Sequence, residues 1–333
     1  RFILIYIAIA CILSLQSCRT GGVSAELDYI ETYINEYPDS ALSVLQNINE
    51  DLLHGRSNRN HYNLLLAQAK DKCFIDETED SVMLSVVNYY SNRRDKDKLF
   101  RAYYYLGRIQ QNAGRYTESI ISYLNAEQII DYSDNDFQKG LLYAQFGKLY
   151  EHQMDFSGAL TAFEQASYYY GRAGSLLHHY YTTLDIGHLY LRMGEYSAAE
   201  FPIKEVLEWA YQSDNDFITE YACDLLCMLY EATEDFQSLN SLLSSKYASI
   251  YSDSVIRNLS LAYKYAIDSQ FNKVQSALDA AWAAAIFPTD TATIYHREYQ
   301  IYKYKGEVNK ALASHEQLFA IQDELVRSAL QQP

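Results

Sequence analysis

One sequence pattern recurs four times along the chain with a period of forty residues. It starts at Leu106-Gly107, Phe146-Gly147, Ile186-Gly187 and Leu226-Cys227. Three units carry a tyrosine four residues after the start, namely Tyr150, Tyr190 and Tyr230. All four units carry an aromatic residue ten residues after the start, namely Tyr116, Phe156, Tyr196 and Phe236. A fixed period of a few tens of residues is typical of stacked helical repeats. Such folds bind partners rather than transform substrates, so the period constrains both fold and functional class.

Each unit is predicted to form two helices joined by a short turn. In the four clearest units the helices are expected at residues 99–113 and 117–132, 138–152 and 157–173, 175–192 and 197–212, and 217–232 and 237–251. Only 4 prolines and 13 glycines occur in 333 residues, which suits a mostly helical chain. Weaker copies flank these units on both sides. The prediction is therefore an all-α, right-handed superhelix of about seven helix-turn-helix hairpins over residues 26–330, with its best repeats between 99 and 251.

The connectors between repeats carry residues that commonly cap helices. The sequence SDNDF stands at residues 133–137 and again at 213–217, two periods later. Asp136 and Asp216 are predicted to cap the helices that follow by accepting backbone N–H bonds, and Ser175 is predicted to do so between them. Four similar pairs precede helical stretches and are favoured as caps, although they also resemble short O-glycosylation signals of Bacteroidota envelopes: Asp39-Ser40, Asp80-Ser81, Asp253-Ser254 and Asp290-Thr291.

The residues at fixed repeat positions suit closely packed helix pairs. Gly107, Gly147 and Gly187 let a partner helix approach, and Ala159 and Ala199 are expected to face them. The unit from residue 146 to 166 resembles the tetratricopeptide repeat through Gly147, Tyr150, Phe156, Ala159, Phe163 and Ala166. The usual unit has about 34 residues, so the resemblance implies helices lengthened by about one or two turns in total. Segments 39–42 and 102–107 are also similar to tetratricopeptide lipoproteins of Bacteroidota.

The first eighteen residues resemble a bacterial lipoprotein signal. Arg1 precedes an apolar run over residues 2–15, and Leu15-Gln16-Ser17-Cys18 resembles a lipobox, whose cysteine becomes the lipidated N-terminus. The run is shorter than the ~20 residues that a membrane-spanning helix needs. The resemblance implies a signal peptide over 1–18, lipidation at Cys18, a tether at 19–25, and an exported protein anchored to an envelope membrane on its periplasmic or surface side. An N-terminal membrane anchor with an incidental cysteine is the alternative.

The charge balance argues against nucleic-acid binding. The chain has 27 Lys and Arg against 43 Asp and Glu, for a net charge of −16. Nucleic-acid binding depends on a basic surface that displaces counterions. An acidic array instead favours basic partners.

The sequence offers no catalytic, cofactor or metal motif with adequate spacing. His315-Glu316 begins like the zinc-protease helix motif, but Phe319 stands where the second histidine is required. The neighbours His178-His179 point about 100° apart on a helix and cannot share a site by themselves. Cys223 and Cys227 lie one helical turn apart on an expected buried face and are interpreted as core residues. The chain is therefore predicted to be no enzyme and to need no cofactor or metal.

The resemblance places a partner in a concave groove lined by the first helix of each repeat. The residues at these inner positions are Tyr104, Arg108, Gln111, Lys148, Glu151, His188 and Glu231. This aromatic and polar lining is suited to an extended peptide or a helix, and an ordinary solvated face is equally compatible with it. The predicted function is a membrane-tethered protein–protein interaction scaffold. The alternatives are the extracytoplasmic sensory part of a longer transcriptional or signalling regulator, and a glycan-capture lipoprotein, although the forty-residue spacing leaves no room for long loops in the central units.

Overall fold

The computed structural model describes residues 22–251 and 254–330 of the chain. In these residues the backbone forms sixteen α-helices, two 3-10 helices at Glu50–Leu52 and Ile130–Tyr132, and no strand. The prediction of an all-α fold is confirmed. None of the described helices is long and apolar enough to span a bilayer. The predicted signal peptide and the predicted lipidation site at Cys18 lie outside the described residues.

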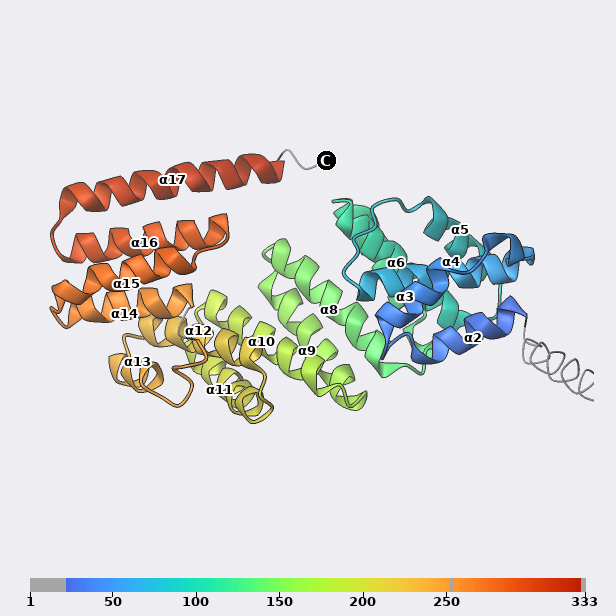
Figure 1. Ribbon diagram of the computed structural model, residues 1–333, viewed down its shortest axis with the longest axis horizontal. Coiled ribbons are helices and arrows are strands. Elements are labelled where there is room, and N and C mark those ends of the chain that lie inside the picture. Colours follow the sequence, from blue (N-terminus) through green and yellow to red (C-terminus); the bar gives the residue numbers. More distant parts are fainter. Residues whose placement is uncertain (1–21, 252–253, 331–333) are drawn as a thin grey trace, which may run out of the picture. The chain divides into compact units, whose positions relative to one another are not determined.

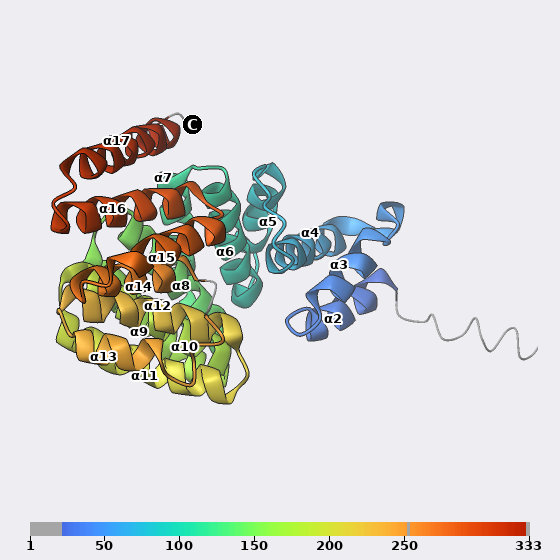
Figure 2. The ribbon, with the colours of Figure 1, turned by 60° about the vertical axis from the view of Figure 1, so that its left-hand side comes forward.

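The chain divides into two compact units, residues 1–138 and 139–333, and the boundary falls inside α8. The helices of unit 1 are α2 (Val23–Tyr33), α3 (Pro38–Gln46), α4 (Gly55–Lys72), α5 (Ser81–Ser91), α6 (Lys96–Asn112) and α7 (Tyr116–Glu127). The helices from the boundary onward are α8 (Asp136–His152), α9 (Phe156–Arg172), α10 (Leu176–Met193), α11 (Tyr196–Gln212), α12 (Asp216–Ala232), α13 (Phe236–Leu243), α14 (Val255–Ile267), α15 (Phe271–Ala284), α16 (Pro288–Tyr304) and α17 (Val308–Leu330). Figure 1 labels them along the chain except α7, which is labelled in Figure 2.

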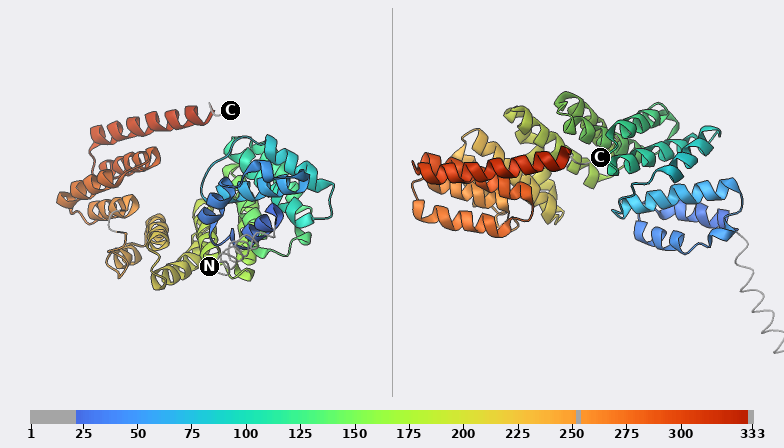
Figure 3. Two further views of the ribbon diagram at one scale, coloured as in Figure 1. Left: turned by 45° about the vertical axis from the view of Figure 1, so that its right-hand side comes forward. Right: turned by 90° about the horizontal axis from the view of Figure 1, so that it is seen from above.

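Within each unit the helices pack as successive hairpins. The two helices of a repeat contact each other, as in α6 with α7, α10 with α11, α14 with α15 and α16 with α17. First helices of neighbouring repeats also contact: α2 with α4 and α4 with α6 in unit 1, and α10 with α12, α12 with α14 and α14 with α16 in unit 2. Figure 2 shows α14 to α17 side by side, and Figure 3 shows α2 to α4 gathered in blue. The described residues thus form eight hairpins, compared with the predicted number of about seven.

Three repeat glycines make room for a large side chain of the partner helix. A Cβ atom added at Gly147 would lie 2.5 Å from the ring of Phe163, and one at Gly187 would lie 2.6 Å from Cγ1 of Ile203. Gly107 stands in the same relation to the ring of Tyr123. The prediction that the glycines allow close packing is confirmed, but the residues that face them are not the alanines that the sequence suggested. Each glycine instead leaves a space that a larger side chain from the second helix fills.

Replacing Gly147 with alanine is expected to destabilise unit 2 by about 1–3 kcal/mol, the usual cost of overpacking a filled core. The added methyl group collides with Phe163, which is only 1% exposed and cannot move aside. Urea unfolding followed by circular dichroism measures the change. Gly22→Ala is the matched control, because no atom lies within 4 Å of its added Cβ. Equal stability of the two variants would show that the packing at Gly147 is loose.

Two helix caps lie one residue earlier than the sequence suggested, whereas Ser175 is at the predicted N-cap position of α10 but accepts no backbone N–H bond with its side chain. In α12 the cap is Asn215, whose Oδ1 accepts a hydrogen bond from the backbone N–H of Ile218 at 3.1 Å. Asn135 accepts from the N–H of Gln138 at the same distance ahead of α8. Asp136 and Asp216 therefore occupy the first turn rather than the cap, where a carboxylate still interacts favourably with the helix dipole.

Two element boundaries also differ from expectation. Helix α2 begins at Val23, so residues 23–25 of the expected tether are helical. Helix α13 ends at Leu243, eight residues before the expected end at 251. The chain turns after it, and the fully buried Tyr251 donates a hydrogen bond from its hydroxyl to the Leu242 carbonyl at 3.0 Å.

Candidate functional site

In unit 1 the predicted groove residues of α6 take part in internal packing. Tyr104 is only 4% exposed, so its ring is not available to a ligand. Arg108 donates from Nε to Asp71 Oδ1 at 2.7 Å and thereby joins α6 to α4. Gln111 accepts a hydrogen bond from the Tyr123 hydroxyl at 2.9 Å and joins α6 to α7. These three side chains hold neighbouring helices together, and the placement of Tyr104 in a binding surface is wrong.

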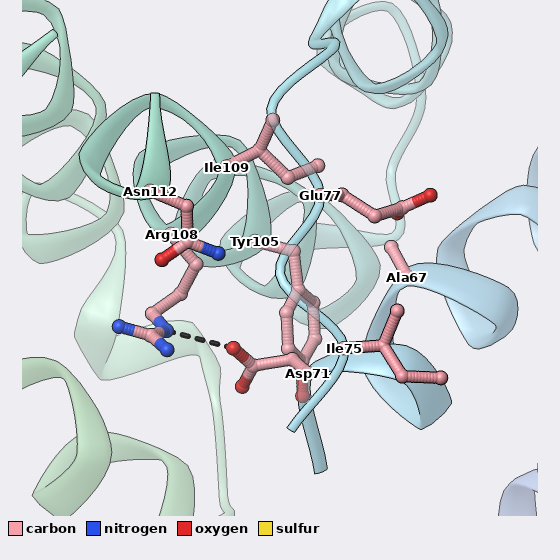
Figure 4. A pocket seen from close by; sticks show the side chains of 8 residues that line it. All are labelled: Ala67, Asp71, Ile75, Glu77, Tyr105, Arg108, Ile109 and Asn112. Atoms are coloured by element: carbon pink, nitrogen blue, oxygen red, sulfur yellow. Dashed lines mark hydrogen bonds and ion pairs between the residues drawn. The ribbon is translucent and has the colours of Figure 1, made fainter. Parts of the chain in front are cut away.

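Beside the Arg108–Asp71 pair lies a very small cavity between α4 and α6 (Figure 4). Its volume is about 10 Å³, which is the space of about one water molecule. In Figure 4 the Tyr105 ring lies between the side chains of Arg108 and Ile75. The cavity is too small to admit a ligand.

A charged network joins α2, α4 and α6 in unit 1. Glu31 Oε2 lies 2.9 Å from His61 Nε2 and 3.5 Å from Lys98 Nζ, and Oε1 pairs with Arg101. Arg101 is 4% exposed and also pairs through Nε with Asp97 at 3.1 Å. Burial opposes ionisation of Glu31, but the hydrogen bond with His61 and the charges of Arg101 and Lys98 lower its pKa far below the usual value. Glu31 is therefore held as a carboxylate.

The same network contains three potential metal ligands. One ligand atom each of Asp28, Glu31 and His61 lies within 4.8 Å of the others. The positive charges of Arg101 and Lys98 already balance Glu31 and oppose a cation at this place. We therefore interpret the cluster as a structural network that pairs the first helices of the repeats.

In unit 2 the predicted residues lie on the first helices of successive repeats. On α8, Lys148 is exposed, and Glu151 pairs with Arg192 of α10 at 2.6 Å. Glu231 of α12 has only 8% of its side chain exposed and pairs with Arg297 of α16. These two ion pairs connect the first helices of different repeats. This side of unit 2 is therefore a polar face on which ion pairs link the helices.

Further residues of this face lie at helical spacing on α10 and α12, and the sequence reasoning did not select them. We define the first-helix face of unit 2 as Lys148 and Glu151 of α8, Tyr181, Asp185, His188 and Arg192 of α10, and Tyr221, Asp224, Met228 and Glu231 of α12. The α10 and α12 residues recur every three or four positions, which places each set on one side of its helix. That spacing is visible in the sequence and was sufficient to find them.

Contacts between α10 and α12 bring these side chains together. The rings of Tyr181 and Tyr221 are 6.4 Å apart, and the Tyr221 hydroxyl lies 3.4 Å from His188 Nδ1. Tyr181 is 38% exposed and Met228 is 41% exposed. The face therefore presents apolar groups to solvent next to polar ones.

Two half-buried carboxyls lie among these groups. Burial raises the pKa of Asp185 to about 7, with the Lys148 charge opposing the rise and the Glu151 charge adding to it. Burial also raises the pKa of Asp224 to about 7, against a hydrogen bond that the Ser254 hydroxyl donates at 2.6 Å. Asp185 forms no hydrogen bond or ion pair with any residue that the structure describes. A carboxyl that is partly removed from water and lacks an internal partner favours an external cation.

The interiors of the same helices are closed. Cys223 and Cys227 are fully buried, which confirms their interpretation as core residues. Burial raises the pKa of Cys223 above its usual value, so this thiol stays protonated at neutral pH.

Comparison with known proteins supports the fold. No family model and no curated protein matches the sequence. Among solved structures, the apo form of RapI matches with a TM-score of 0.70 and 10% identity, covering 92% of this chain and 98% of that one. A Rap protein complexed with Competence and Sporulation Factor matches with a TM-score of 0.58 and 14% identity, covering 92% and 99%. NprR in complex with its cognate peptide NprX matches with a TM-score of 0.55 and 15% identity, covering 90% and 89%. The chain has the fold of the tetratricopeptide-like superhelical repeat proteins.

Proposed function

We propose that this chain is a protein-interaction scaffold and that the first-helix face of unit 2 binds an extended or helical segment of a partner protein. The observation that supports this most is the unpartnered, half-buried carboxyl of Asp185, close to the exposed Tyr181, on a face that also carries the exposed side chain of Met228. Burying a carboxylate without a partner is costly, and so is exposing large apolar groups. A partner segment that places a cation at the carboxylate and covers the apolar side chains removes both of these costs.

The solved neighbours are consistent with this proposal. NprR was solved with its cognate peptide, and a Rap protein was solved with Competence and Sporulation Factor. Helical repeats of this kind present long surfaces that suit extended or helical segments. In the present chain the carboxyls of Asp185 and Asp224 favour a segment that carries lysine or arginine. The net charge of −16 favours the same partners over long range.

Site-specific photo-crosslinking tests the proposed face. A benzophenone side chain replaces Met228, which is 41% exposed on α12, and in a control protein it replaces Phe201, which is 75% exposed on α11. We expect position 228 to capture a defined protein segment in the native cells and position 201 not to capture it. Peptide mapping of the conjugate identifies the segment. Capture of the same partners from both positions, or from position 201 alone, would contradict the proposal.

We further propose that the chain is exported, is tethered to an envelope membrane through a lipid on Cys18, and performs no reaction of its own. The support is the lipobox-like sequence Leu15-Gln16-Ser17-Cys18 at the end of an apolar run. Cys18→Ala is expected to move the protein from the membrane fraction to the soluble fraction, because the lipid is attached at that sulfur. Fractionation and immunoblotting measure the distribution, with Cys73→Ala as the control. A variant that stays with the membrane would show that residues 1–18 anchor it in another way.

A further inference from the structure

A polar pocket lies between the beginning of α4 and the end of α5 in unit 1. Its volume is about 620 Å³, far larger than the cavity beside Arg108. Arg56 and Asn60 of α4 line one side, and Asn88, Tyr89 and the following Asn92 and Arg93 line the other. The lining contains guanidinium, amide and phenol groups and no carboxylate. Its chemistry therefore differs from that of the acidic chain around it.

Some of the lining groups are held in place. The Arg93 guanidinium lies over the Tyr89 ring, 4.8 Å from its centroid. Asn60 is 8% exposed, and its Nδ2 donates to the Arg56 carbonyl at 2.6 Å. Asn92 Nδ2 donates to the Asn88 carbonyl at 2.9 Å. Each of these amide groups retains a second N–H, and the stacked guanidinium loses little freedom when it binds an anion.

The arginines of this pocket differ from half of the arginines that the structure describes. Six others pair with a carboxylate: Arg101, Arg108, Arg115, Arg192, Arg297 and Arg327. Arg56 and Arg93 form no ion pair with any residue that the structure describes, and neither do their neighbours Arg59 and Arg94. In a chain with 43 acidic and 27 basic residues, unpaired guanidinium groups are unexpected. Four of them occur at the pocket or next to it in the sequence.

We propose that this pocket binds a phosphate monoester group. Two guanidinium groups supply two positive charges, and a phosphate monoester carries a charge of about −1.5 to −2 at neutral pH, whereas a carboxylate carries one. The planar fork of arginine matches phosphate oxygens in bidentate geometry. The amides of Asn60 and Asn92 donate to the remaining oxygens. The phosphate belongs either to a soluble ester or to the headgroup of a lipid such as phosphatidic acid.

Titration of the purified full-length chain tests the site. Inorganic phosphate is added at constant ionic strength, and binding is followed by calorimetry and by protection of Arg56 and Arg93 from an arginine-specific reagent. We expect saturable binding in the millimolar range, and at least tenfold weaker binding of acetate. Flotation with phosphatidic acid vesicles, compared with phosphatidylcholine vesicles, distinguishes the two sources. Flotation with phosphatidic acid vesicles but not with phosphatidylcholine vesicles, reversed by free phosphate, indicates that the pocket accepts a lipid headgroup. Saturable binding of free phosphate without flotation indicates a soluble ester, and flotation that free phosphate does not reverse would place the lipid outside this pocket and contradict the lipid source.

Charge-matched variants assign the binding to the pocket. Arg56→Ala with Arg93→Ala is expected to weaken phosphate binding at least tenfold, while Lys204→Ala with Lys310→Ala removes the same charge from unit 2 and leaves it unchanged. Both arginines are exposed, so the fold tolerates their loss, which circular dichroism checks. Lysine at both positions restores the charge without the fork and is expected to give intermediate affinity. Undiminished binding by the alanine pair, equal binding of acetate, or no binding of phosphate and phosphatidic acid would overturn the proposal.

Discussion

Replacing Glu31 with glutamine is expected to lower the free energy of unfolding by about 3 kcal/mol, near the lower end of the range for breaking a buried ion pair. Arg101 is 4% exposed and loses its partner on α2, while Asp97 at 3.1 Å remains. The remaining partner is the reason for the lower value. Urea unfolding at pH 7 measures the loss. Glu26→Gln is the matched control, because Glu26 lies on the same helix, is exposed and forms no ion pair within the described residues.

The pH dependence of the stability difference separates the loss of the Glu31 charge from a loss of side-chain packing. The pKa of Glu31 is lowered in the folded chain, so its carboxylate contributes stability that is present above the unfolded pKa of about 4.3 and is lost as the pH falls. The difference between the original chain and Glu31→Gln should therefore shrink below about pH 4. An equal difference at pH 7 and pH 3 would contradict the electrostatic account.

Replacing Asp185 with asparagine is expected to raise the free energy of unfolding at pH 8 by about 1–3 kcal/mol, because the variant no longer buries an unpaired charge. The folded pKa of Asp185, about 7, lies above the unfolded value. The folded chain therefore holds an extra proton between about pH 4 and 7, and stability falls as the pH rises through this window. Below about pH 4 the variant and the original chain should be nearly equally stable, and at pH 5 the difference should be about a third of that at pH 8.

Urea unfolding at pH 5 and pH 8 measures the effect, with Asp279→Asn on the exposed side of α15 as the control. Groups from four helices act at Asp185: Lys148 and Glu151 of α8, Tyr170 of α9, Tyr181 of α10 and Tyr221 of α12, and His188 lies beside Tyr221. Burial lowers the pKa of His188, so its titration does not account for a change between pH 7 and pH 8. A variant that is less stable than the original chain at both pH values would show that Asp185 makes a stabilising internal contact. A residue that costs stability is typical of a binding surface.

The repeats were predictable from the sequence because they depend on local and periodic signals. Gly147, Tyr150 and Phe163 recur at fixed spacing because each repeat packs on the next in the same way. Boundaries were less predictable. Asn135 and Asp136 are adjacent potential caps, and the choice between them depends on backbone geometry that the sequence does not show. Likewise, the end of α13 at Leu243 was not predicted from the sequence.

The site was less predictable than the fold because residues at the inner positions of a repeat either pack against neighbouring helices or line the surface. Tyr104 and Glu151 both belong to the predicted inner surface of the first helices, yet Tyr104 is buried and Glu151 pairs across the surface with Arg192. Only the packing of neighbouring helices separates these cases. Asp185 has no partner because of what surrounds it, and a single sequence does not reveal that property.

Binding of the segment captured at position 228 to the original chain and to Asp185→Asn, titrated at pH 8 and pH 6, tests the central claim most directly. If ionised Asp185 holds a basic side chain, the original chain should bind about tenfold more weakly at pH 6 than at pH 8, and more weakly still if Asp224 also takes part. Asp185→Asn should bind weakly at both pH values while remaining as stable as the original chain or more so. Equal affinity of the two proteins at pH 8 would contradict the claim.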